Sequence, residues 1–125
     1  MKRRASVEHQ HQAAVIRWAT LATPRIPQLA LLFAVPNAAR RTVGEAAWMK
    51  AEGMKAGVPD LWLPCRGVDP SYIGLVIEMK SPTGTLTESQ KDWRDRLIGA
   101  GWYWALCRSF DEARAELCRY LGAKP

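Results

Sequence analysis

The chain has few cysteines, and no pattern joins them. Its three cysteines, Cys65, Cys107 and Cys118, are odd in number, and no two of them form a C-x-x-C motif. Small disulfide scaffolds use even sets of cysteines, and structural zinc sites use closely spaced pairs. We therefore expect neither a disulfide framework nor a zinc site, and a reducing compartment fits best.

Long apolar runs are also lacking. The longest extends from Leu29 to Val35, whereas a membrane-spanning helix needs about 20 residues. The basic start, Met1 to Arg4, leads into a polar segment rather than an apolar one, so it is not a signal peptide. Internal repeats, low-complexity stretches and linkers are absent as well. These features predict a single cytoplasmic domain over residues 1–125 with no membrane partner.

Basic charge is what the chain has in excess. Its 18 Lys and Arg residues against 12 Asp and Glu give a formal net charge of +6 at pH 7. This excess suits a polyanionic partner, although an ordinary soluble basic protein has it too. Six tryptophans are many for 125 residues. We expect most of them in the core and one or two on a binding surface.

Hydrophobic spacing, capping residues and turn residues predict eight elements. Helices are expected from Ser6 to Leu21, from Thr42 to Gly53, from Thr87 to Gly101 and from Ser109 to Gly122. Strands are expected from Leu29 to Val35 (buried), at Leu61–Leu63, from Ile73 to Lys80 and from Trp102 to Cys107. The order α-β-α-β-β-α-β-α predicts an α/β fold, a small mixed sheet flanked by helices. The last two strands should be parallel because a helix connects them.

The middle of the chain carries the chemistry. Gly57-Val58-Pro59-Asp60 is followed by the apolar strand that ends in Glu78-Met79-Lys80. Side chains alternate along a strand, so Glu78 and Lys80 should share one face. Charged groups on a core strand cost free energy unless something there needs them. Two carboxylates and a lysine are suited to a divalent cation that activates water against a phosphodiester.

These motifs resemble those of a known nuclease family. Pro59-Asp60 and Glu78-Met79-Lys80 resemble the signature of the PD-(D/E)XK superfamily, whose core is like that of restriction endonucleases. Glu8, Pro36-Asn37, Gln90 and Gly101 surround this signature in the order of the VRR-Nuc branch, the virus-type replication and repair nucleases. The resemblance spans about Ser6 to Leu121 and is to the stand-alone type of these proteins.

The resemblance implies a metal site. Asp60 and Glu78 would bind Mg²⁺ or Mn²⁺, with the backbone carbonyl of Met79, and Glu8 would complete the site directly or through a water. Lys80 would orient or deprotonate the attacking water, or offset charge on the phosphate. An oxygen-rich site without His or Cys suits these hard cations.

The resemblance also gives Gln90 a role, a hydrogen bond to the water or to Lys80. Simpler explanations exist for each residue. Asp60 could cap a turn, and Glu78 with Lys80 could form an ion pair on a solvent-facing sheet. Gln90 completes the capping box Thr87-x-x-Gln90. Glu8 could be an acid favoured by the helix dipole.

Several basic residues are candidates for phosphate contact. The candidate DNA-binding residues are Asn37, Arg40 and Arg41 on a loop expected near the metal site, and Lys50, Lys55 and Arg66. Such contacts hold the DNA backbone without reading bases. They favour a structure-selective endonuclease of repair or recombination that cuts branched DNA, with four-way (Holliday) junctions as a candidate substrate.

Two further expectations concern the partners of the chain. A non-catalytic DNA-binding module, or a subunit of a larger repair complex on this fold, is the alternative to an enzyme. Inactive members of such folds usually lose the Asp, the Glu or the Lys, and this chain keeps all three. A homodimer with two-fold symmetry is also expected, because paired nicks need two sites. Trp48 and the segment from Trp102 to Trp104 are candidates for its interface.

Overall fold

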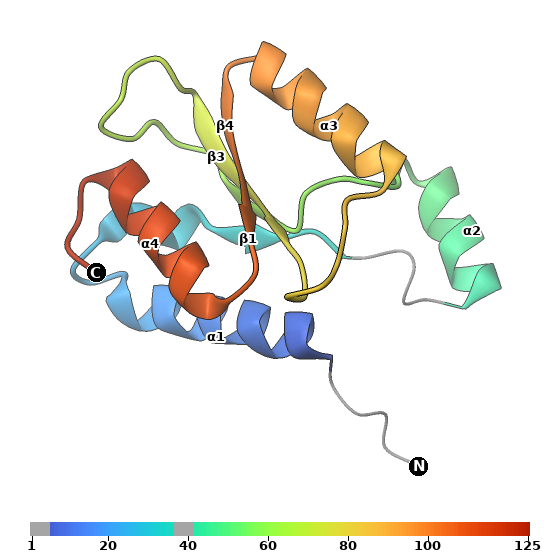
Figure 1. The fold of residues 1–125 in the computed structure, drawn as a ribbon, viewed down its shortest axis with the longest axis horizontal. Helices are drawn as coiled ribbons and strands as arrows, with labels where there is room; N and C mark the ends of the chain where they lie inside the picture. The colour runs from blue at the N-terminus through green and yellow to red at the C-terminus, as the bar shows by residue number, and fades with distance from the viewer. Residues whose placement is uncertain (1–5, 37–41) are drawn as a thin grey trace.

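The computed structural model describes residues 6–36 and 42–125. Its elements, in chain order, are α1 (Val7–Ala22), the short 3₁₀ helix η1 (Pro27–Leu31), β1 (Phe33–Ala34), α2 (Val43–Ala51), β2 (Leu61–Leu63), β3 (Gly74–Met79), α3 (Glu88–Gly99), β4 (Trp102–Cys107) and α4 (Phe110–Leu121) (Figure 1). Apart from η1, this is the predicted order. Within these ranges the strands form a sheet in the order β1-β2-β3-β4.

The sheet is mixed, as predicted. β1 pairs antiparallel with β2, β2 pairs antiparallel with β3, and β3 pairs parallel with β4 through the connecting helix α3. The helices begin at the expected caps. The hydroxyls of Ser6, Thr42, Thr87 and Ser109 each accept a hydrogen bond from a backbone N–H three residues on. The predicted fold class, a mixed α/β sheet flanked by helices, is confirmed.

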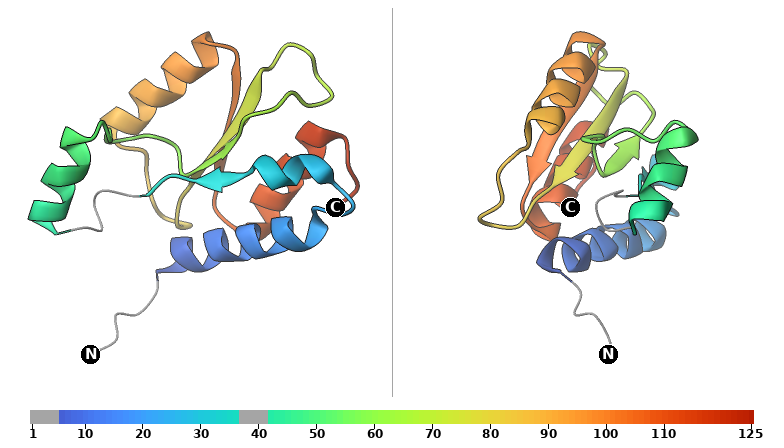
Figure 2. Two further views of the ribbon diagram at one scale, coloured as in Figure 1. Left: turned by 180° about the vertical axis from the view of Figure 1, so that it is seen from behind. Right: turned by 90° about the vertical axis from the view of Figure 1, so that its right-hand side faces the viewer.

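Helices cover both faces of the sheet (Figures 1 and 2). On one face α1 and α4 pack together against the strands, and the main core lies between them. Its members include Val15 and Ala19 of α1, Leu61 and Leu63 of β2, Leu75, Ile77 and Met79 of β3, and Ala113 and Leu117 of α4. On the other face α3 lies along β4. Because side chains alternate, Val76 and Glu78 point to this second face.

The apolar run from Leu29 to Val35 is not the buried strand that its composition predicts. Pro27 opens η1 through Leu31, and only Phe33–Ala34 pairs with β2. Leu29 is buried, whereas Leu31 and Phe33 remain 48% and 47% exposed. Proline fixes φ at a value that suits the first turn of a helix. A short apolar run cannot by itself distinguish a strand from a buried helical turn.

The tryptophans also depart from expectation, because none of the six is fully buried. Trp62 stacks on Phe33 and meets the edge of Trp102, and these rings form an aromatic ridge on the sheet face that also carries α3. Trp48 is 71% exposed on α2, a helix that buries none of its residues. Figure 1 shows α2 at one end of the molecule, where it does not cover the sheet.

None of the helices within residues 6–36 and 42–125 has the length and apolar character to cross a bilayer.

Candidate functional site

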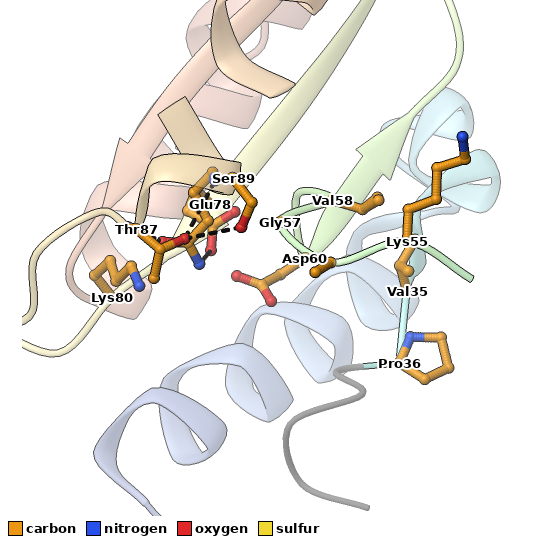
Figure 3. A pocket seen from close by; sticks show the side chains of 12 residues that line it. Val35, Pro36, Lys55, Gly57, Val58, Asp60, Glu78, Lys80, Thr87 and Ser89 are labelled. Carbon is orange, nitrogen blue, oxygen red and sulfur yellow. Dashed lines mark hydrogen bonds between the residues drawn. The ribbon is translucent and has the colours of Figure 1, made fainter. Parts of the chain in front are cut away.

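The register of the sheet brings the predicted carboxylates together. Leu61 of β2 lies opposite Ile77 of β3, so one step further along each strand places Asp60 beside Glu78. Both side chains line a pocket of about 310 Å³ at this end of the sheet, where β3 ends and α3 begins (Figure 3). Residues 18 apart in sequence thus meet because two antiparallel strands join them.

Glu78 is the buried charged residue of the site. Its side chain is 3% exposed, which rules out the alternative of an ion pair on a solvent-facing sheet. Its Oε1 accepts a hydrogen bond of 3.0 Å from Gln90 Nε2. Its Oε2 is buried without a hydrogen-bond partner among the described residues. A buried carboxyl oxygen without a partner is costly and marks a position that a ligand can satisfy.

Gln90 serves two purposes at once. Its Oε1 accepts from the backbone N–H of Thr87 at 2.9 Å, which completes the capping box of α3. Its Nε2 meanwhile donates to Glu78. The two ends of one amide thus form the cap and a contact with Glu78. The hydrogen bond predicted for Gln90, to the attacking water or to Lys80, is a different contact and stays a prediction.

Asp60 is fixed from the neighbouring strand. Its Oδ2 accepts a hydrogen bond of 2.7 Å from the backbone N–H of Met79. It is therefore more than a turn cap, because the contact joins β2 to the end of β3. The metal-ligand role predicted for the Met79 carbonyl concerns a different atom of that residue and stays a prediction.

Burial and mutual repulsion hold both carboxyls toward the protonated form. Desolvation, and then the charge of Asp60 beside it, raise the pKa of Glu78 to about 9. Desolvation also raises the pKa of Asp60, and the hydrogen bond from the backbone N–H of Met79 partly offsets this by lowering it. Lys80 opposes these shifts by lowering the pKa of each carboxyl, but its effect is smaller than that of burial. The pair therefore lacks enough positive charge for both groups to ionise.

Glu8 approaches the pair from α1. Its charge raises the pKa of both Asp60 and Glu78, so it lies near them. Its Oε1 accepts a hydrogen bond of 3.2 Å from the backbone N–H of Ser81, just beyond Lys80. Among residues 6–36 and 42–125, no three or more His, Cys, Asp or Glu side chains form a group suited to a metal. Glu8 as a third ligand therefore stays a prediction.

Two lysines line the pocket on different sides. Lys80 extends from the end of β3, and Lys55 comes from the segment that leads to Asp60. Figure 3 shows them on opposite sides of Asp60, with Lys80 toward Thr87 and Lys55 toward Val35. Lys55, predicted as a DNA contact, is thus part of the pocket wall.

Gly57 is required by the way this wall is built. Its φ is +86°, and a Cβ here would lie 2.5 Å from the backbone carbon of Ser89. Only glycine combines a positive φ with so close an approach. The first turn of α3 can therefore pack directly on the loop that carries Asp60, which keeps Gln90 within reach of Glu78.

Among the described residues, two other predicted DNA contacts, Lys50 and Arg66, do not line the pocket. Asn37, Arg40 and Arg41 lie outside the described residues. Lys50 is in the last turn of α2 and does not line the pocket. Arg66 follows the far end of β2, where it donates to the carbonyl of Pro70. It lies beyond Gly74, on the order of 13 Å along β3 from Glu78.

Sequence reasoning missed part of the pocket lining. Val35, Pro36 and Ser89 also border it. Val35 donates its backbone N–H to the carbonyl of Asp60 at 2.9 Å, so the end of β1 helps to hold the carboxylate loop. Strand pairing of this kind leaves no signature in side-chain type. Ser89 could have been found, because it lies in the first turn of a helix whose cap was recognised.

The oxygen donors fit a hard divalent cation. Asp60 and Glu78 are adjacent, and no described residue hydrogen-bonds the buried Oε2 of Glu78. Lys80 leaves both carboxyls with raised pKa values. A cation between them would satisfy this oxygen and favour both ionised forms.

Comparison with known proteins agrees with this geometry. A family model described as the VRR-NUC domain matches residues 2–111. A solved structure titled "VRR_NUC domain protein" is similar at 25% sequence identity and a TM-score of 0.74, over 96% of this chain and 92% of that one. Among curated proteins no match was found. The chain therefore belongs to the VRR-NUC family, and its fold is a nuclease-type, DNA-processing domain.

Proposed function

We propose that this protein is a metal-dependent endonuclease that hydrolyses phosphodiester bonds in branched DNA. The observation that carries the proposal is the buried Oε2 of Glu78 beside Asp60, which has no hydrogen-bond partner within residues 6–36 and 42–125. A buried carboxylate pair without enough positive charge destabilises a fold, so a selected function is the better explanation. Mg²⁺ or Mn²⁺ bound there would supply positive charge for the scissile phosphate and a more acidic water.

The chain's own residues have separate tasks in this proposal. Asp60 and Glu78 hold the cation, and the bond from Gln90 fixes the rotamer of Glu78. Lys80, on the same pocket wall, orients the attacking water or offsets charge on the phosphate. Because Glu78 is buried, charge interactions with its carboxylate are stronger than they would be in water.

Branched DNA is the proposed substrate because the chain offers phosphate contacts without a base-reading element. Lys55 borders the pocket, and Arg40 and Arg41 remain candidates from the sequence. Backbone contacts of this kind select shape rather than base sequence. We propose a two-fold homodimer for symmetric nicks at a four-way junction. The exposed Trp48 and the aromatic ridge of Phe33, Trp62 and Trp102 supply apolar surface for its interface.

A substrate panel tests the proposal. Purified protein is given single strands, duplexes, flaps, forks and four-way junctions of one sequence set, with Mg²⁺, Mn²⁺ or EDTA. Cleavage of the branched substrates with either metal, and none with EDTA, is the expected result. Binding of branched DNA without any cleavage would instead identify a non-catalytic DNA-binding module. Equal cutting of linear duplex would contradict the selectivity for branched DNA.

A further inference from the structure

The turn that follows Lys80 is tied to the end of β4 by one side chain. Arg108, the residue directly after β4, donates from its Nη1 to the carbonyl of Ser81 at 2.7 Å and to that of Gly84 at 2.8 Å. The carbonyl of Pro82 lies 3.3 Å from the same nitrogen. Gly84 N–H closes the turn on Ser81 O at 3.1 Å. The turn from Ser81 to Gly84 is thus wrapped around a guanidinium group.

Arg108, which anchors this turn, is itself held in place. The backbone N–H of Arg108 donates to Glu112 Oε1 in the first turn of α4 at 3.1 Å. One residue earlier, the carbonyl of Cys107 accepts from Lys80 N–H at 3.0 Å. The end of β4 therefore fixes the backbone of Lys80, and the Arg108 side chain fixes the next four residues. Glu8 adds a bond to Ser81 N–H from the other side.

This turn touches the site directly. A Cβ on Gly84 would lie 3.4 Å from Cδ of Lys80, so the lysine stem passes along the turn. Residues 81–86 are also the link between β3, which carries Glu78, and α3, which carries Gln90. The position of this link sets both the direction of Lys80 and the approach of Gln90 to Glu78.

We infer that Arg108 is a positioning residue for the nuclease site, which it serves by clamping the β3–α3 turn so that Lys80 and Gln90 face the carboxylate pair. The inference rests on the proposed function. Arg108 does not line the pocket and acts through the turn alone. Nη1 of Arg108 makes both short hydrogen bonds, to Ser81 and Gly84, from one planar nitrogen. A lysine ammonium would present its protons in a different geometry, which explains why arginine occupies this position.

The test compares Arg108→Ala and Arg108→Lys with Arg119→Ala as the matched control. Arg119 is an exposed arginine on α4 that pairs with Glu116 at 3.0 Å. Two readouts are taken: kcat and KM on the best DNA substrate, and hydrogen exchange of backbone amides without metal. We expect Arg108→Ala to lower kcat about tenfold or more with KM changed less than about twofold, since misplacement of catalytic groups costs rate rather than binding.

Hydrogen exchange separates clamping from general stability. Arg108→Ala should raise exchange in residues 81–86 about tenfold while α4 and the sheet keep their protection. Arg108→Lys should recover part of both readouts, and Arg119→Ala should change neither. Unchanged kcat with unchanged exchange in Arg108→Ala would overturn the inference, as would faster exchange across the whole chain. If the wild type cut no DNA, the proposed function would fail, and the exchange pattern alone would still decide whether Arg108 clamps the turn.

Discussion

Gln90 hydrogen-bonds the buried Oε1 of Glu78 through its Nε2, while its Oε1 caps the helix that carries it. A single amide thus links the start of α3 to the carboxylate pair. Its donor end restrains a carboxylate whose other oxygen has no hydrogen-bond partner in the described part of the chain. Helix capping and site geometry are therefore coupled, and substitution can separate them.

Gln90→Glu should separate the two roles. Glutamate at this position still accepts from Thr87 N–H and keeps the cap, but it has no N–H for Glu78 and adds a negative charge beside it. We expect cleavage to fall about 10- to 100-fold, as for other residues that support metal ligands. Thr87→Ala is the control, because it should cost about 1 kcal/mol of stability and leave the bond to Glu78 in place. Equal activity of Gln90→Glu and wild type would contradict this prediction.

Asp60→Asn and Glu78→Gln should each remove cleavage and leave the fold intact. Without metal, each substitution removes one carboxyl from a pair that cannot ionise fully in the fold, so the unfolding temperature should stay level or rise. Mg²⁺ should raise the unfolding temperature of the wild type by binding the folded state. This rise should vanish in both variants, which scanning fluorimetry with and without EDTA can measure. A variant that still cut DNA at the wild-type rate would exclude its residue from the metal site.

Stability without metal should fall as pH rises. The pKa of Glu78 moves from an ordinary 4.5 to about 9 in the folded chain. Between these values the unfolded chain is ionised and the folded chain is protonated, so folding takes up a proton. The contribution of Glu78 to the free energy of unfolding is therefore fully present below pH 4.5 and is lost as the pH rises toward about 9. This loss is at most about 1.4 kcal/mol for each pH unit. Urea unfolding in EDTA measures this slope.

Glu78→Gln provides the comparison for that slope. Glutamine is neutral at every pH, so the unfolding free energy of Glu78→Gln should lack the decline that Glu78 causes. A smaller decline from Asp60 should remain, because the pKa of Asp60 is also raised. A wild-type slope no steeper than that of Glu78→Gln would show that Glu78 ionises normally in the fold. Added Mg²⁺ should flatten the wild-type curve, since it favours the ionised carboxylates.

Much of the site could be predicted because its signals are local. Two short motifs specify backbone geometry by themselves, Thr87-x-x-Gln90 and Gly57-Val58-Pro59-Asp60. The alternation of side chains along β3 places Glu78 on the face of the strand opposite to that of Ile77 and Met79. The Leu29–Val35 run was misread because helix and strand bury such a run equally well. Arg108 carried no signal, since its partners are carbonyls of a turn 24 to 27 residues away. Contacts to backbone at that separation depend on the fold rather than on side-chain type.

The contribution of a basic residue to DNA-binding affinity should depend on how near it lies to the pocket. Lys55 borders the pocket, whereas Arg66 lies at the far end of the sheet. Lys55→Ala should weaken binding to all sequences alike and reduce the slope of log K against log salt by about one, because one phosphate contact is lost. Arg66→Ala is the matched control and should change neither. Fluorescence anisotropy over a salt series measures both, and a loss that depended on base sequence would contradict backbone contact.

The last prediction concerns the homodimer. Sedimentation at micromolar concentration should give a mass twice the 14.0 kDa of one chain. Trp48→Ser should shift the equilibrium toward the monomer, because no residue of α2 is buried within the chain and Trp48 is 71% exposed. An aromatic anchor of this kind contributes about 2 kcal/mol or more at an interface. Leu21→Ser is the control, since Leu21 is similarly exposed, at 77%, but lies on α1. A wild-type mass near 14.0 kDa with full nuclease activity would remove the dimer, and with it the paired nicks proposed for a four-way junction.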